Sequence, residues 1–473
     1  MSSRVLKIAP IFLSLVLLWG CSAESRAAVA STTDIATYLT GENPSQAALK
    51  DALDELRLGD RPATQQQSEL IAEFAERAIV NVLARYQAPD VDLSYRTEFK
   101  REISAILTSE HGELRQALAA FLRAPHQPDV LAPFAADASF EGVRRLAIFS
   151  HLIAPQEAIL LYARADEIQP DAFCTFQQSD LNHVMGRDAI ARNLVAVARQ
   201  RWPTDQRVQA IALVKDAYLD GASGLYAERH EKLKRALDLN LQINRLDAAA
   251  STLIALGDQR TPVAQDGEMF VTVDTFAAMD MLRRARDLAL TIESDMLLSD
   301  ASARLANIAA VSDVFGGRDV AEDYRKEALE AAMRFGDLHR AAEIAKTATL
   351  LHVADRRFEL AQHYADRLEL IGFQLSEPGT VVSARIQQSE IRMGQGDHAG
   401  ADLILTRTWG IGEFARLGRE SLAFGRGRIA QDQGDAAAAC RHYSFAHDGY
   451  VNQGYAEGAT MTEELMHAAS CPN

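Results

Sequence analysis

Apolar residues recur along this chain with the period of an α-helix. In the stretch from residue 68 to residue 86 they stand mostly three or four positions apart: Leu70, Ile71, Phe74, Ala78, Ile79, Val82 and Leu83. This spacing puts them on one face of a helix, because an α-helix has 3.6 residues per turn. Similar patterns continue from Ser45 nearly to the C-terminus. The sequence therefore predicts an all-α protein.

Small residues recur at fixed intervals in the C-terminal part of the chain. One column has intervals of 40, 40 and 38 residues: Ala321, Ala361, Ala401 and Ala439. A second column lies twelve residues before the first: Ala309, Thr349, Ser389 and Gly427. Two closely packed helices need small residues where they touch, and a period of about 20–50 residues indicates a stacked repeat array. We predict an α-solenoid of stacked antiparallel helical hairpins.

The clearest unit resembles the tetratricopeptide repeat (TPR). It runs from Arg304 through Gly316 and Ala321 to Tyr324 and Ala328, and a similar unit surrounds residues 434–446. The sequence departs from the family pattern at three places, namely Arg356 in place of a turn glycine, and Leu368 and Thr408 in place of alanine. The resemblance covers roughly a third to two-fifths of the chain. It implies a superhelix whose first helices line a concave, partner-binding face.

The pattern divides the chain into four parts. Residues 1–20 are predicted to be an export signal, residues 21–44 a flexible tether, residues 45–275 irregular helical hairpins, and residues 276–473 TPR-like repeats with a C-terminal capping helix. Residues 257–274 interrupt the helices and contain the most strand-like run, Met269–Val273. Two interpretations of this segment remain open: an ordered loop that covers the core, or a lid or partner-binding loop.

The N-terminus indicates export. Arg4 and Lys7 precede an apolar run of eleven residues, which is too short to cross a bilayer as a mature helix. The run ends in Leu18-Trp19-Gly20-Cys21, which resembles the bacterial lipoprotein box and implies lipidation of Cys21. The alternative is ordinary cleavage after Ala30. We expect a periplasmic protein anchored to the outer membrane.

Charge and cysteines narrow the choice of partners. The formal net charge is −16, which disfavours nucleic acid and leaves a lipid anchor as the expected contact with a membrane. The oligomeric state stays open.

Of the four cysteines, Cys440 and Cys471 flank the last two predicted helices, so we predict a possible disulfide between them. The state of Cys174 stays open.

The sequence suggests neither a catalytic residue nor a cofactor. Two G-x-G-x-x-A matches begin at Gly410 and Gly425, inside the predicted helical array, so we interpret them as packing glycines and not as a dinucleotide fingerprint. Glu359 and His363 share a helix face, yet two ligands do not make a metal site. We expect no metal site and no enzymatic activity.

The phase of the small residues predicts where a partner binds. The predicted groove residues on the first helices are Lys346, Leu350, Ile386, Glu390, Phe424 and Arg428. This mixture of apolar and charged side chains suits a peptide or a partner helix. The preferred function is a non-catalytic interaction scaffold of the cell envelope. The alternatives are a periplasmic small-ligand sensor that acts through a partner, and an all-helical enzyme subunit.

Overall fold

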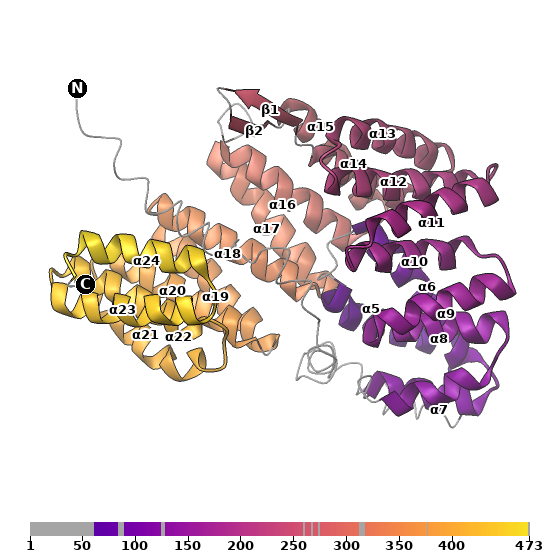
Figure 1. Ribbon diagram of the computed structural model, residues 1–473, viewed down its shortest axis with the longest axis horizontal. Helices are drawn as coiled ribbons and strands as arrows, with labels where there is room; N and C mark the ends of the chain where they lie inside the picture. The colour runs from indigo at the N-terminus through magenta and orange to yellow at the C-terminus, as the bar shows by residue number, and fades with distance from the viewer. Residues whose placement is uncertain are drawn as a thin grey trace. The chain divides into compact units, whose positions relative to one another are not determined.

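The computed structural model describes residues 61–83, 89–123, 128–258, 261–265, 268–272, 275–311, 317–375 and 377–471 (Figure 1). The described residues form two compact units, an N-terminal unit up to residue 337 and a C-terminal unit from residue 338. The predicted export signal, its Cys21 and the predicted tether lie outside the described residues. The predicted change of pattern after residue 275 falls inside the N-terminal unit. No described helix is both long and apolar enough to span a membrane.

Within the described ranges the secondary structure is helical apart from one pair of strands. The elements in chain order are α5 (Gln65–Leu83), α6 (Pro89–Thr108), α7 (Gly112–Arg123), η2 (Pro128–Ala136), α8 (Phe140–Ile153), α9 (Pro155–Ile168), α10 (Ala172–Val184), α11 (Asp188–Arg201), α12 (Gln206–Ala222), α13 (Tyr226–Gln242), α14 (Leu246–Gly257), β1 (Thr261–Gln265), β2 (Glu268–Thr272), α15 (Thr275–Thr291), α16 (Asp295–Val311), α17 (Gly317–Phe335), α18 (Leu338–Ala354), α19 (Phe358–Gln374), α20 (Pro378–Gly394), α21 (His398–Gly412), α22 (Gly418–Asp432), α23 (Ala436–Asn452) and α24 (Ala456–Ala468).

Consecutive helices pair into hairpins, and each hairpin packs on the next. From α8 onward the even-numbered helices are the first helices of the hairpins and the odd-numbered helices are the second. Each first helix also contacts the preceding second helix, which makes the packing continuous along each unit. The predicted all-α solenoid of TPR-like hairpins is confirmed, and it includes the irregular region before residue 275.

Small residues close the hairpins, as their spacing predicts. All eight residues of the two columns are buried. The Ser389 hydroxyl donates to the Ala401 carbonyl oxygen at 3.2 Å, twelve residues along the chain. A Cβ atom at Gly427 would lie 2.5 Å from the Tyr443 ring. The N-terminal unit has the same contact: the Ser179 hydroxyl donates to the carbonyl oxygen of Ala191, also twelve residues later, at 3.1 Å.

The turns between helices use left-handed backbone and side-chain caps. Gly396 ends α20 with φ 84°, a conformation that costs glycine little. Asp397 then accepts a hydrogen bond from the Gly400 N–H and caps α21. Arg356, which stands where the family has glycine, adopts the same left-handed conformation with φ 58°. The turn is therefore kept without the residue that normally makes it.

The strand-like segment forms an antiparallel β-hairpin between α14 and α15. β1 pairs with β2 from Thr261 opposite Thr272 to Gln265 opposite Glu268. β1 also contacts α13. The hairpin is thus an insertion between the two helices of one repeat, and both open interpretations of its role stay predictions.

Candidate partner-binding surface

The predicted groove of the C-terminal unit contains an ion pair between neighbouring repeats. Arg428 Nη1 on α22 lies 2.6 Å from Glu390 Oε1 on α20. The Glu390 side chain is 17% exposed and that of Arg428 30%. Burial lowers the pKa of Arg428, but the charge and hydrogen bond of Glu390 outweigh burial and raise it. The two residues lie side by side across two first helices, and the pair remains accessible to solvent.

Two of the other predicted groove residues, Phe424 and Ile386, pack against neighbouring helices of their own unit. Phe424 rests its ring on Tyr443 of α23, with ring centroids 5.9 Å apart, and Ile386 packs against the core between α20 and α22. Leu350 is only 6% exposed, whereas Lys346 is half-buried. A residue three places before the small column is rotated by only about 60° from it. Phe424 and Ile386 therefore contribute to hairpin packing, which makes Phe424 a poor choice for a mutation meant to spare the fold.

A six-residue motif that the repeat analysis missed marks this surface. It reads Phe-Gln-Gln-Ser-Asp-Leu at residues 176–181 of α10 and Ile-Gln-Gln-Ser-Glu-Ile at residues 386–391 of α20. In both copies the serine hydroxyl closes its hairpin. In both copies the acid after the serine pairs with a base on the next first helix. The signal was present in the sequence as two hexapeptides 210 residues apart that share Gln-Gln-Ser and differ conservatively at the other three positions.

In the N-terminal unit the corresponding ion pair is sealed from solvent. Lys215 Nζ on α12 lies 2.7 Å from both carboxylate oxygens of Asp180 on α10. The two side chains are 3% and 5% exposed. All residues of α10 from Cys174 to Asn182 are buried, so α10 has neighbours on every side. Its inner side, away from α11, is therefore covered.

The cover is helix α6, which lies against several first helices of its own unit. It contacts α8, α10 and α14 (Figure 1). The Tyr95 hydroxyl donates to the Ile148 carbonyl oxygen at 2.6 Å, and the Tyr95 ring lies 4.2 Å from the His151 ring. Phe99 meets Phe149 edge to face at 5.8 Å between ring centroids. An aromatic face thus fixes α6 on α8.

Charged side chains on α6 complete this interface. Arg144 of α8 pairs with Glu98, and its Nη1 donates to Glu102 Oε1 at 2.9 Å. Arg145 Nε lies 3.1 Å from Glu102 Oε2. Arg96 contacts Met296 of α16, and its guanidinium lies 4.7 Å from the centre of the Phe335 ring of α17. One helix therefore bridges the beginning and the end of the N-terminal unit.

Burial shows that α6 is a structural element. Its fully buried apolar side chains include Tyr95, Phe99, Ile103, Ile106 and Leu107. At about 1.5–3 kcal/mol for each, their burial contributes on the order of 10 kcal/mol. Displacement of α6 by a partner would forfeit most of this stabilisation. The part of the inner side that these α6 side chains cover is consequently closed to a partner.

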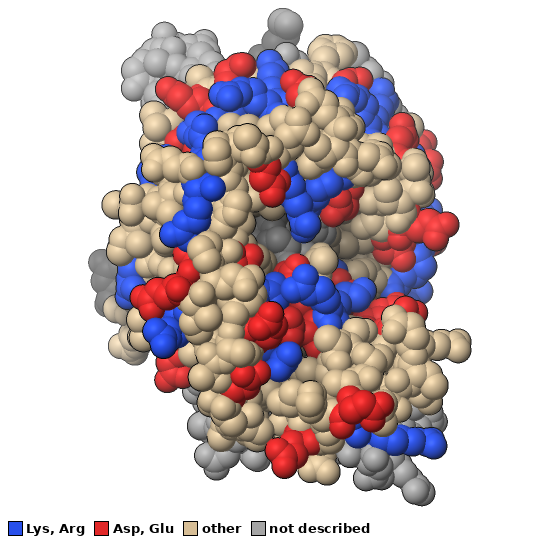
Figure 2. All heavy atoms as spheres, turned by 90° about the vertical axis from the view of Figure 1, so that its right-hand side faces the viewer, with Lys and Arg blue, Asp and Glu red and all other residues tan. Residues whose placement is uncertain are grey.

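An open cavity of about 670 Å³ lies beside α6 in the N-terminal unit. It is lined by Thr97, Thr204–Arg207, Ile243, Arg245 and Asp247. Asp205 is engaged as the cap of α12, and Arg245 lies 3.8 Å from Asp247. Figure 2 shows one face of this unit, hollowed at its centre, with basic and acidic side chains mixed around the hollow. The charges that line the cavity balance, so they select no class of charged ligand.

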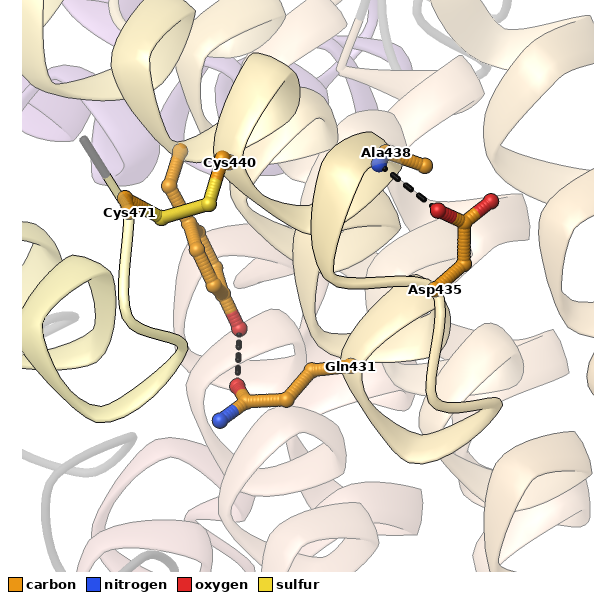
Figure 3. Close-up of a disulfide and its surroundings, with 6 residues drawn as sticks. Gln431, Asp435, Ala438, Cys440 and Cys471 are labelled. Carbon is orange, nitrogen blue, oxygen red and sulfur yellow. Dashed lines mark hydrogen bonds between the residues drawn. A yellow bond between two sulfur atoms is a disulfide. The ribbon is translucent and has the colours of Figure 1, made fainter.

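A disulfide joins Cys440 of α23 to Cys471, which follows α24 (Figure 3). The two Cα atoms are 5.4 Å apart, within the range that a disulfide spans. This is the pair that the sequence predicts. Nearby, the Tyr443 hydroxyl donates to Gln431 Oε1 at 2.7 Å and Asp435 caps α23 through the Ala438 N–H. The bond ties the last helix to the hairpin before it.

The remaining cysteine of the described residues, Cys174, is buried and reduced. Burial and the neighbouring Asp171 carboxylate raise the pKa of its thiol. A thiol that stays protonated is a poor nucleophile. Cys174 therefore acts as a core residue.

The glycine pairs singled out in the sequence lie in helices. A Cβ atom at Gly412 would lie 2.8 Å from Leu422, and one at Gly425 would lie 2.9 Å from Leu405. In the described part of the chain, no strand directly precedes α21 or α22 to form a dinucleotide-binding unit. The described residues also contain no cluster of three or more His, Cys, Asp and Glu that could hold a metal.

Comparison with known proteins returned fold likenesses only. No family model matches the sequence, and no curated protein matches it. Among solved structures, a Rap protein complexed with Competence and Sporulation Factor is 14% identical, with 84% of this chain and 97% of that chain covered and a TM-score of 0.39. The human IFIT1 dimer with m7Gppp-AAAA is 11% identical, with 93% and 100% covered and a TM-score of 0.45. A signal transduction ATPase with a tetratricopeptide repeat sensor from Pyrococcus horikoshii is 11% identical, with 86% and 66% covered and a TM-score of 0.45.

Proposed function

We propose that this chain is a non-catalytic scaffold that binds a partner protein or peptide through the first helices of its C-terminal unit. One observation carries the proposal. The Glu390–Arg428 pair remains partly exposed on α20 and α22, whereas the corresponding pair of the N-terminal unit is buried. The C-terminal unit therefore offers the surface that the N-terminal unit has already filled.

The N-terminal unit supports this proposal, because it contains an example of such binding. Its first helices hold α6 through tilted and edge-to-face aromatic contacts and through ion pairs with glutamates. Grooves of this kind commonly accept an amphipathic helix, with apolar anchors for affinity and charges for register. The first helices of this array have the chemistry to bind a helix.

The proposed setting is the bacterial cell envelope. Leu18-Trp19-Gly20-Cys21 supports lipidation at Cys21 and attachment to the periplasmic face of the outer membrane. Labelled palmitate should enter the wild-type protein and be absent from Cys21→Ser. A soluble mature form that begins at Ser31 would contradict the anchor and leave the binding proposal untouched.

We do not propose a nucleic-acid partner. The net charge of −16 opposes binding to a phosphate backbone. The face of the N-terminal unit in Figure 2 mixes Lys and Arg with Asp and Glu, and it carries no separate basic stripe. A protein surface with paired charges suits this composition better.

Site-specific photo-crosslinking in the source cells would test the binding surface. Asp432 is exposed at the end of α22, about 140° around the helix from Gly427, and Leu403 is exposed on the second helix α21. A photo-reactive residue at position 432 should give one dominant protein adduct, and the same residue at position 403 should not. The adduct should disappear in Arg428→Glu.

Identical adducts from positions 432 and 403 would overturn the assignment of this surface. So would a position-432 adduct that survives Arg428→Glu. Circular dichroism of each variant provides the control for folding. Mass spectrometry of the adduct would name the partner.

A further inference from the structure

The turns of the C-terminal unit lie at two edges of its helical array. Within the described residues, three turns lead from a first helix to its second helix, and three lead from a second helix to the next first helix. Successive helices of such an array run antiparallel, so turns of one kind share an edge and turns of the other kind lie at the opposite edge. The two edges differ in their exposed side chains.

The edge that holds the first kind of turn is polar. Its turns are residues 355–357, 395–397 and 433–435, which read Asp-Arg-Arg, Gln-Gly-Asp and Gln-Gly-Asp. Within the described residues, neither these turns nor the helix ends beside them expose a large apolar side chain. A polar edge is what an array of helices in water requires.

The opposite edge has an exposed apolar side chain at each of its three turns. Phe373 and Val451 are each the last residue but one of a second helix, α19 and α23, and both are 55% exposed. Phe414 lies in the turn between α21 and α22 and is 77% exposed. Apolar residues scattered singly over a surface need no explanation. These three recur at one edge, which we call the apolar edge.

The turn that carries Phe414 is longer than the others and is firmly closed. It has five residues, whereas every other turn of the unit has three. A Cβ atom at Gly418 would lie 2.5 Å from the Gly412 carbonyl oxygen, so the two ends of the turn approach closely. Glu413 pairs with Arg419 across the turn at 2.8 Å. Three residues suffice elsewhere, so the longer turn serves to place Phe414 in solvent.

Packed side chains support this turn. The Trp409 ring at the end of α21 contacts Phe445 of α23, with ring centroids 5.5 Å apart. The guanidinium of Arg419 on α22 lies 5.9 Å from the centre of the Trp409 ring. Three helices therefore meet beside the turn, and Phe414 projects from a fixed support.

The charge of this turn suits a surface of phosphate groups. Arg416 is exposed and makes no ion pair within the described residues, whereas Glu413, the acid of the turn, is paired with Arg419. The acids Glu377 and Asp448 lie near the other two turns, so the contact is centred on the α21–α22 turn. Charges beyond a Debye length of about 8 Å are largely screened, so the net charge of the whole chain matters less here.

We propose that the apolar edge inserts into the surface of a phospholipid bilayer, with Phe414 in the acyl region and Arg416 at the lipid phosphates. The shape of the edge favours this occupant. Its apolar side chains project from separate turns, so a protein partner would need a matching pocket for each one. A bilayer accepts any projecting apolar group, and aromatic side chains beside basic ones are typical of interfacial segments.

This inference goes beyond the proposed function, because it concerns a second surface and does not require lipidation of Cys21. The chain from Ser31 onward is suitable for the test, since it keeps every described residue and lacks both Cys21 and the apolar run of the predicted export signal. Cys174 is buried and Cys440 is bonded to Cys471. A cysteine placed at an exposed position can therefore be labelled alone.

A polarity-sensitive fluorophore at Phe414→Cys should report the insertion. Its emission should shift to the blue and saturate as vesicles of phosphatidylethanolamine and phosphatidylglycerol are added. Leu403→Cys is the matched control, because Leu403 is also exposed but lies in the first half of α21, away from the apolar edge. The label at position 403 should keep the emission that it has in water.

Substitutions in a chain labelled at Phe373→Cys identify the inserting residues. Phe414→Ser should raise the lipid concentration for half-maximal response at least about tenfold, because burial of the ring is lost. Phe414→Leu, which stays apolar, should respond nearly as the parent does. Arg416→Glu should raise that concentration at least about fivefold, and Arg392→Glu, near the polar edge, should not. Circular dichroism of each variant provides the control for folding.

Four results would overturn the proposal: equal responses at positions 414 and 403, no saturable response at 414, equal binding of Phe414→Ser and Phe414→Leu, or normal binding of Arg416→Glu. A blue shift that grows with protein concentration without vesicles would also overturn it, because the occupant would then be a second copy of this chain. Position 432 lies at the polar edge, at the end of α22. Its crosslinking therefore tests the proposed function separately.

Discussion

The two copies of the Gln-Gln-Ser motif make the same hydrogen bond and the same kind of ion pair, but their ion pairs differ in exposure to solvent. In the N-terminal unit the ion pair between Asp180 and Lys215 is covered and both side chains are at most 5% exposed. In the C-terminal unit the pair between Glu390 and Arg428 keeps 17% and 30% of its side chains exposed. Both motifs close a hairpin through the same serine hydroxyl. In the N-terminal unit α6 contacts α10, the helix that carries Asp180.

The two units also close their arrays differently. In the N-terminal unit α6 bridges from α8 to α16 and α17, so a helix of the chain fills the inner side. The C-terminal unit fixes its last helix with the Cys440–Cys471 disulfide. This covalent tie lies at the end of the array and joins only its last two helices. The comparison therefore separates a unit whose inner side is covered by a helix of its own from one whose last helix is tied by a disulfide.

The largest loss of stability is expected when the buried cation Lys215 is replaced. Lys215→Met leaves Asp180 buried without its partner, which should lower the free energy of unfolding by about 3–5 kcal/mol. Arg428→Met in the more exposed pair should cost no more than about 1 kcal/mol. Urea unfolding followed by circular dichroism measures both. Equal losses of unfolding free energy in the two variants would show that burial does not set the contribution of these ion pairs to stability.

The disulfide should matter only to the C-terminal unit. Cys440 and Cys471 are separated by 31 residues, and in the chain-entropy model a loop of that length stabilises by about 3.5 kcal/mol. The double variant Cys440→Ser, Cys471→Ser should lose that amount and expose α24 to limited proteolysis. Protease resistance of residues 61–337 is the internal control. Loss of resistance in both units would contradict their independent closure.

Local spacing explains why the hairpin array could be predicted from the sequence. Small residues twelve positions apart, such as Ser389 and Ala401, meet within one hairpin, so their contact leaves a periodic mark. Contacts across the N-terminal unit leave no such mark. Tyr95 reaches Ile148 over 53 residues and Arg96 reaches Met296 over 200. The covering role of α6 therefore had no signal in the sequence period.

The candidate site could be predicted only in part for a related reason. The helical phase predicted Glu390 and Arg428 on the same face of successive first helices, and the two side chains form an ion pair. The helical phase could not tell whether Phe424 faces the predicted groove or the partner helix of its hairpin, because its position on α22 lies between these two faces. In the structure the Phe424 ring contacts Tyr443 of α23, so it belongs to the hairpin interface. The burial of Leu350 depends on tertiary packing in the same way.

Acid should weaken the covered N-terminal unit through His151. Burial between Tyr95 and Tyr162 lowers the pKa of His151 to about 3, below its unfolded value of about 6.5. Because the unfolded chain takes up the proton first, the stability from neutral His151 is complete above pH 6.5. It falls on the order of 1 kcal/mol per pH unit as the pH drops towards 3. The difference between wild type and His151→Leu over this range isolates the effect, and parallel pH profiles would contradict it.

The smallest change in stability is expected for two substitutions by glycine, and its size should be the same in both units. Glu293 in the N-terminal unit and Arg356 in the C-terminal unit are exposed, and both adopt left-handed backbone, with φ 54° and 58°. In each turn the next residue donates its N–H to a carbonyl five residues earlier, from Ser294 to Ala289 and from Arg357 to His352. Glycine adopts this conformation without a Cβ penalty but loses more chain entropy. Glu293→Gly and Arg356→Gly should therefore each raise the free energy of unfolding by about 0.5–1 kcal/mol, measured by urea unfolding, with a similar gain in both units. A gain confined to one unit would show that tertiary cover, and not local backbone, sets the energy of these turns.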